Sequence, residues 1–180
     1  MEKNLLDTSI EEPAMDAGEV EMALFALDRS RAQFAWKVGG LDAEALHRRH
    51  PPSAMTLAGL IKHLALVEDE RTCVDLLGRP LGEPWTKADP QGGWAVDGDS
   101  PEELYALWQG AVDRSRAALA ELLPHGGLDQ RSKFRTRDGE SPNLRRVLTD
   151  LHDEYARHVG HADLFREAID GLVGEDPPQA

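Results

Sequence analysis

The stretch LHDEYARHVGHADLFRE, residues 151–167, has the spacing of a long helix with one buried face. Apolar side chains recur there in alternating steps of about four and three residues, the period of a helix face packed against neighbours. The face continues in both directions and comprises Leu144, Leu148, Leu151, Tyr155, His158, Ala162, Phe165 and Ile169. His158 is the polar exception, and a buried imidazole costs free energy unless a partner satisfies it. The sequence therefore predicts a core helix with a functional or hydrogen-bonded histidine in its centre.

Three further helices are predicted upstream of this one. The first runs from about residue 19 to 39, and the second from about 56 to 77. The third begins at Ser100, where Pro101 and Glu103 complete the pattern of a capping box with proline in the first turn. The fourth opens after the sequence SPN and ends at Gly171 or Gly174. Four long amphipathic helices in a chain of 180 residues predict an all-α fold, a four-helix bundle with long connections.

The domain limits follow from where the helical pattern begins and ends. Residues 1–18 are expected to form a flexible N-terminal tail, residues 19–175 the bundle, and residues 176–180 a short C-terminal tail. The loop from 79 to 99 is longer than most helix–helix connections and contains Trp85 and Trp94. Its indoles are expected to cover one end of the bundle, with a lid over a ligand as the alternative.

Composition limits the functional classes. With 33 acidic and 20 basic residues the formal net charge is −13, which argues against a nucleic-acid partner. No apolar run has the length of a membrane span, and the N-terminus has no signal-peptide pattern. The single cysteine, Cys73, excludes an internal disulfide. These features predict a cytoplasmic protein.

Three ionisable side chains are predicted to meet inside the bundle. His63 borders the apolar face of the second helix, while Glu154 and His158 project together from the fourth at positions i and i+4. Metal sites in bundles are built from such side chains on facing helices, and two imidazoles with one carboxylate suit zinc, nickel or iron. A glutamate hydrogen-bonded to a core histidine satisfies the same spacing, so the spacing alone leaves both interpretations open.

At these residues the sequence resembles the DinB superfamily of metal-binding four-helix bundles, and in particular a branch common in actinobacteria. TLAGLIKHLALVEDE, residues 56–70, is similar to the motif on the second helix of that family, and LHDEYARHVGHADLFREAIDG, residues 151–171, to the motif on its last helix. The resemblance implies a metal site with His63 as the first ligand.

The last helix departs from the commoner His-x-x-x-His pattern of the superfamily. This sequence has Glu154 in the first position and His158 in the second. The same replacement occurs in the N-terminal domain of mycothiol-dependent maleylpyruvate isomerase, a zinc relative, so the resemblance implies that Glu154 is a ligand. His161 stands where many members carry glutamine, and it is the candidate general base.

Three functions are compatible with this ligand set. The first is a metal-dependent transferase that uses a low-molecular-weight thiol such as mycothiol and acts on a small electrophilic substrate. The alternatives are a metal-dependent hydrolase with an activated water and a metal-binding stress protein without catalysis. Zinc is the expected metal, with nickel or iron as alternatives. The resemblance also implies a homodimer.

Overall fold

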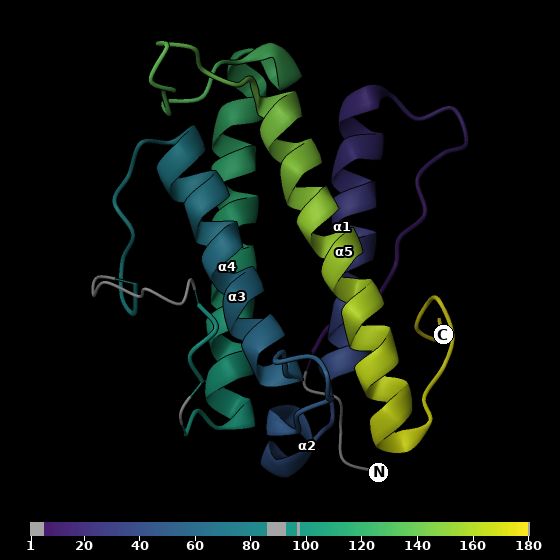
Figure 1. Ribbon diagram of the computed structural model, residues 1–180. Helices are drawn as coiled ribbons and strands as arrows, with labels where there is room; N and C mark the ends of the chain where they lie inside the picture. The colour runs from purple at the N-terminus through teal and green to yellow at the C-terminus, as the bar shows by residue number, and fades with distance from the viewer. Residues whose placement is uncertain (1–5, 86–92, 97, 180) are drawn as a thin grey trace.

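The computed structural model describes residues 6–85, 93–96 and 98–179, and Figure 1 shows a helical bundle. The described residues form five α-helices, α1 (Glu19–Val38), α2 (Ala43–His47), α3 (Leu57–Asp69), α4 (Pro101–Leu122) and α5 (Leu144–Asp170). A π-helical segment, η1 (Glu70–Leu76), continues α3, and two short 3-10 turns follow α4 at Leu123–His125 and Gly127–Asp129. The described residues contain no strand, only an isolated bridge between Arg131 and Asn143. The prediction of an all-α four-helix bundle is confirmed, with α2 as a short addition.

The four long helices pack mainly as two pairs. α1 packs on α5, and α3 packs on α4, whereas α3 and α5 have fewer close contacts with each other. In Figure 1, α3 and α5 lie next to each other at the front of the bundle, with α4 and α1 behind them. Side chains from α3 and α5 therefore face each other across a wider separation than those within either pair.

Local sequence signals set the beginnings of the helices. The Ser100 side chain accepts a hydrogen bond from the Glu103 backbone, and the Glu103 carboxylate accepts one in return, which confirms the predicted capping box. Thr56 caps α3, and Asn143 caps α5. At the other end of α5, Gly171 adopts a φ of 78°, a left-handed conformation that glycine accommodates without strain.

The predicted apolar face of α5 forms part of the core. Tyr155 and Leu151 are fully buried and His158 is 6% exposed, while Ile169 at the end of the face packs against the core with partial exposure. Phe34 from α1 meets the rings of Trp108 on α4 and Tyr155 on α5 edge to face.

Among the described residues no helix is both long and apolar enough to span a membrane.

The described parts of the two terminal segments contact each other and the bundle. Leu6 is buried in the core, and the backbone of Ile10 donates a hydrogen bond to the side chain of Gln179. In the C-terminal segment, the Asp176 carboxylate accepts hydrogen bonds from Arg29, and the buried ammonium of Lys37 donates one to the carbonyl of Gly174. The bundle is thus closed on this side by its own terminal segments. The limits 1–18, 19–175 and 176–180 stay a prediction.

Candidate metal centre between α3 and α5

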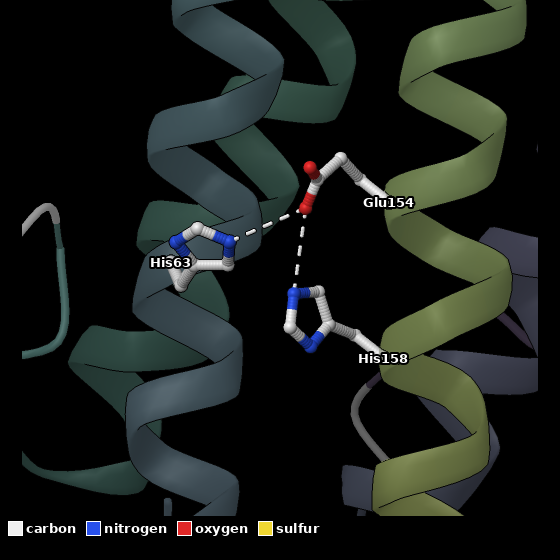
Figure 2. Close-up of side chains that lie close together, drawn as sticks. All are labelled: His63, Glu154 and His158. Carbon is white, nitrogen blue, oxygen red and sulfur yellow. Dashed lines mark ion pairs between the residues drawn. The ribbon is translucent and has the colours of Figure 1, made fainter.

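The structure brings together the three residues that the sequence singled out as metal ligands. His63 extends from the second turn of α3, and Glu154 and His158 extend from successive turns of α5 (Figure 2). The Nε2 atom of His63 lies 3.5 Å from Oε2 of Glu154, and Nε2 of His158 lies 3.4 Å from the same oxygen. One ligand atom from each residue falls within 4.8 Å of the others.

These separations are compatible with a metal-ligand set. Nitrogen–oxygen hydrogen bonds to a carboxylate are usually ~2.7–2.9 Å long, so 3.4 and 3.5 Å are long for that purpose. Ligand atoms bound tetrahedrally to zinc at ~2.0–2.1 Å lie about 3.3–3.5 Å apart. The donors therefore fit a divalent ion of the zinc type, which prefers imidazole nitrogen with carboxylate oxygen.

The exposure of the three side chains is graded. The side chain of His158 is 7% exposed, that of His63 17% and that of Glu154 31%, so the carboxylate is the most open part of the cluster. Burial lowers the pKa of His158 to about 4, and the nearby His63 and His161 act in the same direction, while Glu154 opposes them. His158 is consequently neutral at pH 7, the form in which imidazole binds a metal.

His161 lies on the far side of His158 from the carboxylate. Its Nδ1 atom is 3.2 Å from Nδ1 of His158, whereas Nε2 of His158 faces Glu154. A neutral imidazole that offers Nε2 to a metal carries its proton on Nδ1 and donates it to a neighbour, and His161 is that neighbour here. The geometry thus connects His161 to the cluster through His158. The role of general base stays a prediction.

The two tryptophans of the predicted 79–99 loop have different surroundings. Trp85 is buried, and its indole N–H donates a 2.8 Å hydrogen bond to Asp69. Trp94 instead stacks on the imidazole of His63, with ring centroids 4.4 Å apart. Residues 86–92 and 97 of the loop lie outside the described residues. Trp85 therefore packs in the core, and Trp94 lies against the His63 side of the candidate centre.

A buried ion pair next to the centre was not predicted from the sequence. The Arg31 guanidinium donates two 2.7 Å hydrogen bonds to the two oxygens of Glu68, and Glu68 also accepts one from the hydroxyl of Tyr155. Burial acts to lower the pKa of Arg31, but Glu68 outweighs it and the net pKa is raised. One sequence feature could have indicated this pair: Arg31 and Glu68 are charged residues on helix faces that are otherwise buried.

Two of the concave surfaces lie away from this cluster. One, of about 350 Å³, lies between α1 and α4 and is lined by Arg31, Trp108 and the N-terminal residues Asp7 and Ser9. Another, also of about 350 Å³, lies beside Cys73 and Arg114. Neither has the facing imidazole and carboxylate groups of the α3–α5 cluster.

The comparisons identify the family. The sequence model described as Mycothiol-S-transferase matches residues 23–171, which include both helices of the candidate centre. No curated protein and no solved structure is significantly similar to the chain. The match covers well over half of the 180 residues and agrees with the resemblance to DinB-like bundles. The chain belongs to the mycothiol-S-transferase family, a DinB-like family.

Proposed function

We propose that this protein is a metal-dependent S-transferase that joins a low-molecular-weight thiol, mycothiol in the first instance, to a small electrophilic substrate. His63, Glu154 and His158 would hold a divalent metal, with zinc favoured by the donor set. The observation that carries the proposal is the spacing of 3.4 and 3.5 Å between Glu154 Oε2 and the two imidazole nitrogens. The family match supports a thiol cosubstrate.

When bound, a divalent metal lowers the pKa of a coordinated thiol so that the thiolate is present near neutral pH. Three protein ligands also leave room for a further ligand, as catalytic sites of this type require. The transfer forms a carbon–sulfur bond and breaks the bond to the leaving group. The leaving group departs with the electron pair, and the proton of the thiol passes to it or to solvent.

The protein side chains would prepare the site for this step. His158 is neutral at pH 7 because it is buried, so no proton has to be displaced from it. His161 would accept a hydrogen bond from the Nδ1–H group of His158 and hold the ring with Nε2 toward Glu154. The negative charge of Glu154 would offset part of the metal charge. His161 is therefore a positioning residue in this proposal, because it acts through His158.

One set of measurements tests the proposal. Protein purified without a histidine tag should contain metal in a ratio close to one per chain, and the zinc-loaded form should consume mycothiol together with an electrophile. Thiol-independent cleavage of ester or amide substrates would favour the hydrolase instead. A metal-loaded protein that turns over no member of either panel would favour a non-catalytic metal-binding role. Protein that contains no metal and gains no thermal stability from added zinc, nickel or iron would refute the ligand assignment.

A further inference from the structure

Trp94 covers one face of the His63 imidazole. The two rings are nearly parallel, with an interplanar angle of 16° and centroids 4.4 Å apart. The same indole meets His158 edge to face, with centroids 5.7 Å apart. His63 and His158 are themselves 4.9 Å apart at an interplanar angle of 77°. One indole thus contacts both of the imidazoles that would bind the metal.

Two glycines permit this close approach. Gly93 has a φ of +84°, and a Cβ atom there would lie 3.1 Å from the Cα atom of His63. On α3, a Cβ atom at Gly59 would lie 3.2 Å from the Trp94 ring. Contacts this short are tighter than ordinary Cβ contacts, so a side chain at either position would push the segment away from α3. The backbone is therefore shaped to seat Trp94 on His63.

A second attachment lies five residues later in the chain. The Asp99 carboxylate forms a 2.8 Å ion pair with Lys62, the residue next to His63. The backbone carbonyl of Asp99 lies 2.9 Å from Nε2 of His47, at hydrogen-bond distance. Trp94 is therefore bracketed by Gly93, packed on α3, and Asp99, paired with α3. Contacts with α3 thus lie on both sides of Trp94 in the sequence.

We infer that Trp94 is a positioning residue, which holds the His63 imidazole in the orientation that directs Nε2 toward Glu154. The second side-chain torsion of histidine has a broad energy profile, so a free imidazole samples many ring orientations. Stacking against the indole of Trp94 restricts that torsion before any ligand is present. A preorganised ligand loses less entropy when it binds, which increases affinity. The inference rests on the proposed metal site only for its functional consequence.

Zinc affinity is the first readout. Calorimetric titration of metal-free protein with zinc should show that Trp94→Ala raises Kd by roughly 10- to 100-fold, the usual effect of removing a group that orients a ligand. Trp94→Phe, which retains a stacking ring, should recover most of the affinity. Trp85→Phe is the matched control, because Trp85 belongs to the same loop but contacts Asp69, and its Kd should equal that of the parent.

The second readout needs no metal. In the metal-free parent, NMR signals of the His63 ring protons should be shifted upfield by the indole, and the couplings between its β protons and the ring atoms, which report the second torsion, should indicate one ring orientation. Trp94→Ala should remove the shift and produce averaged couplings. Unchanged couplings, or an unchanged Kd in Trp94→Ala, would overturn the inference. If the parent binds no zinc, the proposed function fails, and the couplings alone then decide whether Trp94 positions His63.

Discussion

The hydroxyl of Tyr155 donates a 2.7 Å hydrogen bond to the carboxylate of Glu68, and this contact ties α5 to α3 one residue away from Glu154. The same hydroxyl accepts a 2.8 Å bond from the indole N–H of Trp108 on α4. Arg31 on α1 binds both oxygens of Glu68. Side chains from all four long helices therefore converge beside the candidate centre, and they fix the helices that carry its ligands.

The Glu68→Gln substitution should strongly destabilise the bundle. It would leave the Arg31 guanidinium, whose side chain is 4% exposed, without its main counter-charge. Breaking a buried pair in this way usually costs about 3–5 kcal/mol in the free energy of unfolding. Urea denaturation followed by circular dichroism measures the change. Asp153→Asn is the control, since its pair with Arg157 is exposed and its loss should leave stability unchanged within error. A urea midpoint of Glu68→Gln equal to that of the parent protein would contradict this expectation.

The parts of the fold that the sequence predicted correctly depend on short-range patterns. The buried face of α5 follows from helical periodicity, and the capping box at Ser100 follows from three neighbouring residues. The contact between His63 and Glu154 is predictable because the helix pattern places both residues toward the inside of the bundle. That prediction rested further on the family resemblance, since spacing alone did not separate a metal site from a satisfied pair.

The contacts that the sequence does not predict are pairings between residues far apart in the chain. Arg31 and Glu68 are 37 residues apart on different helices, and periodicity does not reveal which buried charge meets which. The stacking of Trp94 on His63 depends on how a loop folds back, which no periodic pattern describes.

The homodimer also stays a prediction, which light scattering at micromolar concentration would test.

The Ser100→Ala substitution should destabilise the bundle modestly. The Ser100 hydroxyl accepts a hydrogen bond from the Glu103 backbone at the start of α4, and its removal leaves that N–H without its cap. Loss of such a cap usually costs about 0.5–2 kcal/mol. The same urea experiment should show a lowered midpoint with an unchanged slope. Ser100→Asp should preserve the cap, and equal losses in both variants would show that the cap is not responsible.

The stability of the metal-free protein should fall as the pH is lowered from about 6.5 to 4. Because the pKa of His158 is lowered to about 4 in the folded state, the unfolded chain binds a proton in this interval that the folded chain does not. The contribution to the slope is at most about 1.4 kcal/mol per pH unit, and it vanishes above the unfolded pKa of ~6.5. Melting temperatures of the parent and of His158→Gln, measured in chelator across this range, should therefore converge toward low pH. If the melting temperatures of the two proteins change with pH in parallel, His158 does not contribute to the pH dependence of stability.

Substitutions in His63, Glu154 and His158 test the ligand set directly. If His63, Glu154 and His158 bind one metal, replacing any of them by alanine should lower zinc affinity steeply while the helices remain formed. The reason is that each supplies one donor atom to a cluster whose atoms lie within 4.8 Å of one another. His161→Gln should retain the metal, because His161 contacts His158 through Nδ1 and lies away from Glu154. Metal stoichiometry and zinc titration measure these differences.

A hydrogen-bonded core pair would give the opposite ordering. In that case His158→Ala would mainly lower the free energy of unfolding, by about 1–3 kcal/mol, and metal content would be near zero in every variant. His125→Ala is the control for nonspecific binding of zinc to histidine, because His125 is exposed in the turn after α4. Full affinity in Glu154→Ala would remove only the carboxylate from the set and would make His161 the third ligand to test, since its imidazole contacts that of His158.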